Sequence, residues 1–163
     1  MAFLDAGLLF LLVGGAVALL LRRHVTAASV VGAGTAVIGA VLAMVPFAQV
    51  LISGEPLAAI WPWGLSVGSG AVGVDALSAW FGLVIASIGA LAAWYGAGYL
   101  RHGHDAHRAP ATWASYNLLI VAMLGVVVAR DGFLFLIAWE VMTWASFLLV
   151  VFDHTDPGVR RAG

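Results

Sequence analysis

The sequence predicts an all-α membrane protein, with residues 1–163 forming a single membrane domain of five transmembrane helices. Hydrophobic residues make up 63% of the chain and charged residues only 9%, with a mean hydropathy of +1.06. A soluble domain uses about 25% charged residues to cover its surface. The apolar residues also gather into runs near the length of about 20 residues that crosses a bilayer. We therefore expect a multi-pass protein of the cell inner (plasma) membrane, in contact with the lipid bilayer.

Each predicted helix is an apolar run that stops at charged residues or at helix breakers. The first stops at Arg22, the fourth at Arg130 and the fifth at Asp153. The predicted helices cover residues 6–21, 25–52, 75–100, 111–129 and 133–152. Between the second and third helices, residues 53–74 are rich in glycine and proline and alternate weakly in polarity. This pattern predicts an external loop with some hairpin character.

The positions of the arginines predict how the helices are oriented. A cleaved signal peptide has basic residues before its apolar run, whereas here Asp5 precedes the first run and Arg22 and Arg23 follow it, so we expect a retained helix. With the N-terminus outside, only Arg130 among the seven arginines falls in an external segment. Cytoplasmic loops carry an excess of basic residues. The sequence therefore predicts an external N-terminus and a cytoplasmic C-terminus.

Small residues recur every four positions along the second and third predicted helices. The rows are Gly32-Ala36-Ala40, Gly82-Ala86-Ala90 and Gly89-Ala93-Ala97. Such rows let helix backbones approach closely in a membrane. We expect tight helix contacts on these faces, although alanine and glycine are abundant enough for some rows to arise by chance.

One acidic side chain lies deep inside a predicted helix. Glu140 follows Asp131 by nine residues, or roughly 13 Å of helix, which places its carboxyl near the middle of the bilayer. A charge at this depth costs at least about 2.5–3.5 kcal/mol, so we expect the carboxyl to be protonated, paired with a cation or hydrated. Each of these states suits a proton relay. The alternative is a protonated glutamate that makes one structural hydrogen bond between helices.

Few side chains of this chain are expected to assist Glu140. Thr143 lies one turn further on, near the same face, where its hydroxyl can bond or hydrate the carboxyl. His154 is too distant for contact, at roughly 21 Å of helix rise, but is a candidate for passing protons between this region and the cytoplasm. The chain has no lysine, and its arginines lie near the ends of the predicted helices. Glu140 is therefore expected either to be neutral or to find its cationic partner in another chain.

Other features exclude several classes of function. A net charge of −1 argues against a nucleic-acid partner, and the absence of cysteine excludes disulfides and thiolate metal sites. His102, His104 and His107 lie in one short predicted loop, which we interpret as a solvated basic turn, so we expect no metal site and no cofactor bound by this chain. Asp75 is expected to cap the third helix, and Asn117 to bond a neighbouring helix.

Several stretches resemble a known family. Residues 133–154, which contain the pattern Trp-Glu-x-Met at 139–142, resemble the fifth helix of the proton-pumping, antiporter-like membrane subunits. These subunits occur in respiratory complex I, in Mrp-type sodium/proton antiporters and in energy-converting hydrogenases. The ending at 148–154 is similar to the branch of hydrogenase-4 component B and formate hydrogenlyase subunit 3. Residues 73–81 and 95–100 look like the start and end of the family's third helix.

The resemblance implies a function for Glu140. It matches the family's fifth-helix glutamate, which couples to a lysine on the seventh helix. The resemblance covers the N-terminal third of the family, so the chain is expected to be an N-terminal fragment or a split part of a longer subunit. Other membrane subunits would then supply the remaining helices and the lysine. Iron–sulfur clusters or metal centres are expected in peripheral redox subunits.

Three functions remain open at the level of sequence. The first is a membrane subunit of a complex I-like or hydrogenase-type proton-translocating oxidoreductase, in which this chain is not itself catalytic and Glu140 is the relay carboxylate. The second is a subunit of an Mrp-type sodium/proton antiporter. The third is a five-helix scaffold or assembly subunit without transport, in which bulky substitutions at Gly82 or Ala86 would disrupt complex formation.

Overall fold

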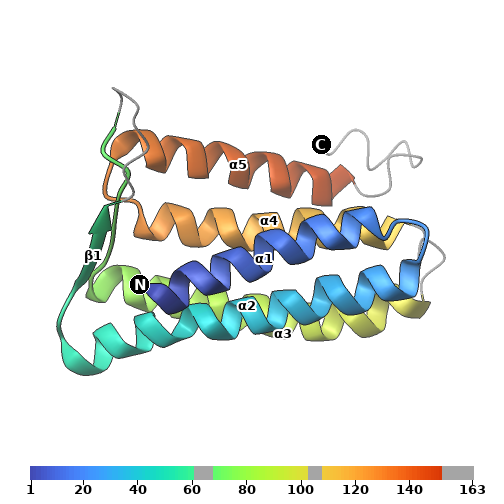
Figure 1. The fold of residues 1–163 in the computed structure, drawn as a ribbon, viewed down its shortest axis with the longest axis horizontal. Coiled ribbons are helices and arrows are strands. Elements are labelled where there is room, and N and C mark those ends of the chain that lie inside the picture. The colour runs from blue at the N-terminus through green and yellow to red at the C-terminus, as the bar shows by residue number, and fades with distance from the viewer. Residues whose placement is uncertain (61–67, 103–107, 152–163) are drawn as a thin grey trace.

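The structure is a bundle of five long helices with a short β-hairpin at one end (Figure 1). It is a computed structural model and describes residues 1–60, 68–102 and 108–151. The helices are α1 (Ala2–Leu20), α2 (Val25–Ser53), α3 (Ala76–His102), α4 (Ala109–Val128) and α5 (Gly132–Val150). All five are long and apolar enough to cross a membrane. The five predicted spans are therefore confirmed, with bounds that shift by at most a few residues.

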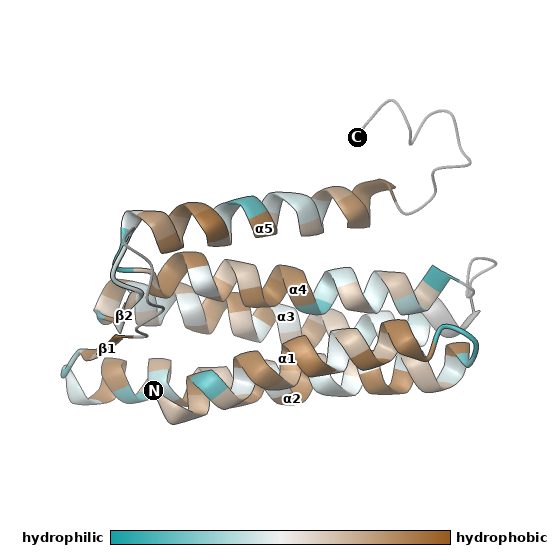
Figure 2. Ribbon diagram, turned by 45° about the horizontal axis from the view of Figure 1, so that its top comes forward, coloured by the Kyte–Doolittle hydropathy of each residue, from teal (hydrophilic) through white to brown (hydrophobic). Residues whose placement is uncertain are grey.

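Hydrophobic residues dominate the lengths of all five helices, as Figure 2 shows. Hydrophilic residues gather mainly near the ends of the bundle, and many large apolar side chains on the outer faces are exposed. This distribution is the reverse of a soluble bundle, since it places apolar surface where lipid tails would lie. The apolar outer faces of the helices therefore support the multi-pass membrane protein that the composition predicted.

The hairpin pairs two short strands from the segment between α2 and α3. Strand β1 (Leu57–Ile60) runs antiparallel to β2 (Ala71–Val74), with Leu57 opposite Val74 and Ile60 opposite Ala71. The predicted hairpin character of residues 53–74 is confirmed for these strands, while residues 61–67 of this segment lie outside the described part of the chain. An isolated bridge joins Val72 to Ala129, just after α4. The hairpin is thereby attached to the α4–α5 connection.

Small residues allow the helices of the bundle to come close together, as their spacing predicted. A methyl group added at Gly82 of α3 would lie 2.5 Å from Cζ of Phe47 on α2. One added at Gly32 of α2 would lie 2.4 Å from Cβ of Trp113 on α4. Contacts this short leave no room for a side chain, so the glycines set the spacing between the helices. The Gly82 row therefore packs against another helix of this chain. A bulky side chain at Gly82 is expected to disturb the packing of this bundle directly, whether or not it also disturbs the assembly of a complex.

The fifth helix lies on the outside of the bundle, against α4 (Figures 1 and 2). Only 11% of its spanning window is buried, against 33–39% in the other four helices. Its two buried residues are Ala138 and Ala145. At the α4–α5 contact, a methyl group at Gly125 would lie 3.3 Å from Cβ of Ala138. Most of α5 is therefore uncovered by the rest of the described chain.

Candidate functional site

The candidate site is centred on Glu140, which lies near the midpoint of α5. The helix begins where the side chain of Asp131 accepts hydrogen bonds from the backbone N–H groups of Phe133 (2.8 Å) and Leu134 (3.2 Å). This cap satisfies donors that a helix start otherwise leaves unpaired. Because the cap fixes where α5 begins, Glu140 stands roughly 13 Å of helix away from that end.

The carboxyl of Glu140 lies on the uncovered side of α5. Ala138 and Ala145 pack toward α4, whereas Glu140 and Thr143 are exposed. Among the described residues, Glu140 makes no hydrogen bond and no ion pair. A carboxylate facing hydrocarbon in this state is costly, so the arrangement leaves its partner or its water to come from outside the described chain. That Glu140 is either neutral or paired with a cation of another chain stays a prediction.

The hydroxyl of Thr143 is engaged with its own helix. Its Oγ1 donates to the carbonyl of Trp139 at 3.0 Å, and Oγ of Ser146 donates to the carbonyl of Thr143 at 3.0 Å. The structure therefore does not join the Thr143 proton to Glu140, although the oxygen of the hydroxyl keeps lone pairs that can accept a hydrogen bond. His154, the third relay candidate, lies outside the described residues.

The aromatic neighbours of Glu140 are also exposed. Trp139 packs against Phe135 with ring centroids 5.7 Å apart, and Trp144 meets Phe147 edge-on at 6.4 Å. Both contacts lie along α5 itself. An apolar and aromatic surface therefore surrounds the carboxyl on the uncovered face of α5.

Arg130 is excluded as the partner of Glu140 because it is already paired. One of its guanidinium nitrogens lies 3.0 Å from a carboxylate oxygen of Asp75, and the same nitrogen donates to Oγ of Ser78. Asp75 in turn accepts hydrogen bonds from the backbone N–H (2.8 Å) and the hydroxyl (2.7 Å) of Ser78, which confirms its predicted role as a cap of α3. These bonds from Ser78, followed by the charge of Arg130, lower the pKa of the Asp75 carboxyl.

Asp131 links the start of α5 to the hairpin segment. Besides capping α5, its Oδ2 accepts hydrogen bonds from the N–H and hydroxyl of Ser69 and from the N–H of Gly70 at 2.9 Å. Loss of surrounding water raises the pKa of this carboxyl, but the backbone N–H groups at both of its oxygens outweigh that effect and lower the pKa to about 2. We call these two linked sets of contacts the polar clamp. Its residues are Asp75, Ser78 and Arg130 together with Asp131, Ser69 and Gly70.

A second polar contact lies inside the bundle. The side-chain amide of Asn117, which is fully buried, donates to the carbonyl of Gly32 on α2 at 3.0 Å and to that of Trp113 at 2.8 Å. The hydroxyl of Tyr116 donates to the carbonyl of Gly89 on α3 at 2.6 Å. The expected bond from Asn117 to a neighbouring helix is confirmed. The bond from Tyr116 was not anticipated, although an aromatic hydroxyl one turn into a span would have been a reasonable signal for it.

No family model matches the chain. It is 35% identical over 82 residues to the putative antiporter subunit mnhA2 of Staphylococcus saprophyticus, covering 50% of this chain. It is 34% identical over 99 residues to NADH-quinone oxidoreductase subunit L of Mycobacterium tuberculosis, covering 61% of this chain. Subunit L of Escherichia coli is 32% identical over 102 residues, covering 60% of this chain.

Over part of its length, the chain is similar to antiporter-like and complex I membrane subunits. The resemblance inferred from the Trp-Glu-x-Met pattern is thus confirmed at the level of this family. The matched stretches cover only 10–16% of the length of these three relatives. The similarity supports a multi-pass membrane protein and does not extend to the greater part of these three relatives. The hydrogenase branch remains a prediction from the ending at 148–154.

Proposed function

We propose that this chain is a membrane subunit, or part of one, in a complex I-like or hydrogenase-type assembly that translocates protons, and that Glu140 is its proton-relay carboxylate. The observation that supports the proposal best is the state of Glu140. It stands at mid-span on the uncovered face of α5, with no partner among the described residues. The redox chemistry and its cofactors would belong to partner subunits.

The energetics of Glu140 support a relay over a purely structural role. A structural hydrogen bond would offset part of the cost of burying a carboxyl in the membrane, but no acceptor or donor within the described chain provides one. A neighbouring subunit that placed a cation or a water-filled path against α5 would stabilise the carboxylate and lower its pKa. Movement of that cation would raise the pKa again, and the proton affinity of Glu140 could then alternate.

The family relationship supports the same assignment. The relatives carry the names of an antiporter subunit and of an NADH-quinone oxidoreductase subunit, and both names refer to parts of larger complexes. We propose that other membrane subunits cover the exposed side of α5 and supply a lysine that couples to Glu140. Peripheral redox subunits would complete the assembly.

The decisive experiment replaces Glu140 by Gln in the native assembly. The expected result is proton translocation that falls to background in inside-out membrane vesicles, measured with a pH-sensitive dye, while the amount of inserted chain is unchanged. Gln keeps the shape of the side chain but cannot carry a proton at neutral pH. The matched control is Glu55→Gln, since Glu55 is an exposed glutamate between α2 and β1. Translocation by Glu140→Gln at the wild-type rate would refute the relay.

A second candidate is a subunit of an Mrp-type sodium/proton antiporter, favoured by the name of the staphylococcal relative. Deleting the chain would then make growth sensitive to sodium without changing the activity of any hydrogenase or quinone reductase. A third candidate, a scaffold without transport, would leave Glu140→Gln harmless. Purification of the native complex distinguishes these cases by the subunits that accompany the chain.

A further inference from the structure

The turn between α1 and α2 exposes three basic or titratable side chains. Arg22, Arg23 and His24 follow one another, and all three are exposed. None of these side chains forms a hydrogen bond or an ion pair with a described residue. The spanning helices end at this turn, so it lies at a membrane boundary. Two guanidinium groups are therefore available to an anionic group at that boundary.

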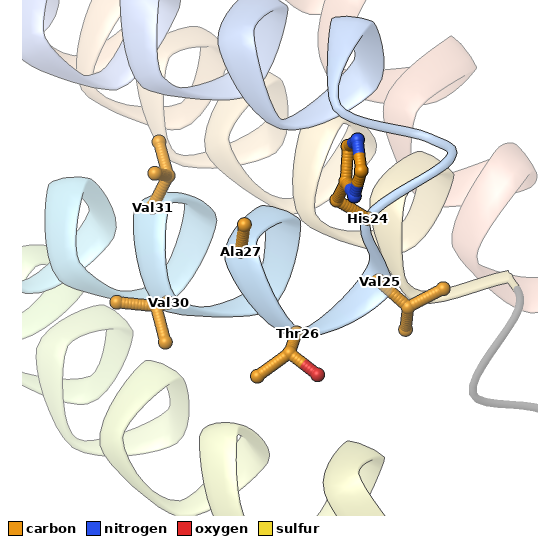
Figure 3. Close-up of a pocket in the computed structure, with 6 residues that line it drawn as sticks. All are labelled: His24, Val25, Thr26, Ala27, Val30 and Val31. Carbon is orange, nitrogen blue, oxygen red and sulfur yellow. The ribbon is translucent and has the colours of Figure 1, made fainter.

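Two neighbouring hollows lie along α2, beginning at this turn. Its first part has a volume of about 550 Å³ and is lined by residues from His24 to Val31. Figure 3 shows Thr26 and Val30 projecting from the same side of the first turns of α2, with His24 at the turn itself. The second part, of about 280 Å³, lies between α2 and α3 and reaches Ile38 and Trp94. Val30 lines both parts, and we call the two together the α2 groove.

The length and chemistry of the α2 groove match one leaflet of a bilayer. From His24 to Ile38 the helix rises roughly 21 Å, and one leaflet with its headgroup region is roughly 20–22 Å thick. The walls are almost entirely apolar side chains, including Ala33, Val37 and Ala97. At Gly34 an added methyl group would meet no atom within 4 Å, so the groove is open there. A single acyl chain can follow this path from the boundary toward the bilayer centre.

We propose that the α2 groove binds an acyl chain of an anionic phospholipid whose headgroup lies against Arg22 and Arg23. The combination of features favours this occupant. A zwitterionic lipid would use the apolar walls but gain little from two unpaired guanidinium groups. Free phosphate would interact with the two guanidinium groups but gain nothing from the apolar walls of the groove. Basic residues beside a groove at a membrane boundary are the usual recognition elements for anionic headgroups. The proposal does not depend on Glu140 or on transport.

The test measures how lipids quench Trp94, which lines the groove and is 77% exposed. The chain is reconstituted in nanodiscs of phosphatidylcholine that contain a small fraction of phosphatidylglycerol with bromine on its acyl chains. The signal of Trp94 is the difference between the wild type and Trp94→Phe. We expect brominated phosphatidylglycerol to quench Trp94 at far lower mole fractions than brominated phosphatidylcholine does. Equal quenching by the two lipids would overturn the proposal.

Two variants separate the headgroup from the acyl chain. Replacing Arg22 and Arg23 by Gln should reduce the preference for phosphatidylglycerol roughly 5-fold per arginine, or roughly 25-fold in total, whereas replacing both by Lys should retain it. Gly34→Phe should displace the acyl chain and protect Trp94, because the position is open. The matched control is Ala16→Phe, at an exposed position of α1 that does not line the groove. Unchanged quenching in Gly34→Phe would refute binding in the groove.

Salt provides a measurement that needs no charge variant. At 1 M salt the Debye length falls to about 3 Å, so the wild-type preference for phosphatidylglycerol should largely disappear while quenching by both lipids persists. Sodium phosphate and sodium chloride at equal ionic strength should act alike. Selective displacement by inorganic phosphate would show that a free anion, and not a lipid, occupies the basic end, and would contradict the proposal.

Discussion

At the scale of single residues, the central observation is that Glu140 and its neighbour Thr143 are both exposed yet differ in their bonding. The Thr143 hydroxyl has its proton engaged by Trp139, whereas the Glu140 carboxyl has no described partner. Sequence reasoning singles out this carboxylate because a charged group at mid-span is costly wherever it lies, and its relay role stays a prediction. It could not decide the direction of the Thr143 hydroxyl, which depends on a rotamer.

A pair of variants tests whether Thr143 assists the relay. Thr143→Val removes the hydroxyl and is expected to slow proton translocation by roughly 2- to 10-fold, the usual range for one lost hydrogen bond. Thr143→Ser keeps the hydroxyl and should remain close to the wild-type rate. Both rates are measured in the vesicle assay used for Glu140→Gln. If Val and Ser behave alike, the hydroxyl has no part in proton transfer.

Asp131 carries a prediction about pH. The pKa of Asp131 is lowered to about 2, below the ordinary value of 3.8. The hydrogen bonds that its carboxylate accepts therefore stabilise the fold fully above about pH 4, and this stabilisation is lost as the pH falls toward 2. We expect the Asp131 carboxyl carbon, followed by NMR, to titrate with a midpoint near 2. The amide signals of Ser69 and Gly70 should shift over the same range. A midpoint near 3.8 would mean that the polar clamp does not hold in solution.

At the scale of elements, glycines decide how closely the helices pack. Gly32 and Gly34 lie on the same helix, but only Gly32 has a neighbour in contact distance. The periodic spacing of small residues predicted tight contacts and could not say which helix each row would meet. Gly82 faces α2, while Gly32 and Gly89 face α4. The assignment of a partner to each row requires the arrangement of the bundle.

This difference between the two glycines yields a matched stability test. Gly32→Ala places a methyl group against Trp113 and should destabilise the bundle by about 1–3 kcal/mol. Gly34→Ala adds a methyl group in open space and should stabilise the helix by about 0.4–1 kcal/mol. Unfolding in mixed micelles measures both free energies. Equal effects of the two substitutions would contradict the close contact between α2 and α4.

At the scale of the whole molecule, the ends of the bundle differ in character. The turn with Arg22 and Arg23 lies at the end where α3 finishes and α4 begins, and the hairpin lies at the opposite end (Figure 1). Arg130, at the hairpin end, is neutralised by Asp75. This separation is compatible with the predicted external N-terminus, although the direction of insertion stays a prediction from the arginine count.

The absence of cysteine makes the orientation easy to measure. Single cysteines can be introduced in place of Glu55, at the hairpin end, and of His24, at the α1–α2 turn, both of which are exposed. A membrane-impermeant maleimide is expected to label Glu55→Cys in intact cells and His24→Cys only after the cells are permeabilised. The opposite pattern would show that the chain inserts with its N-terminus inside.

The sequence by itself determined the five spans, the hairpin segment, the cap of α3 and the position of the mid-span carboxylate, because hydropathy and capping are properties of neighbouring residues. Only the tertiary structure decided which side of α5 is uncovered and which groups form hydrogen bonds or ion pairs with Arg130 and Asp131. The bonds from Ser69 to Asp131 and from Arg130 to Ser78 join residues 62 and 52 positions apart. Interactions over such separations arise from how the helices pack, and local patterns carry no record of that packing.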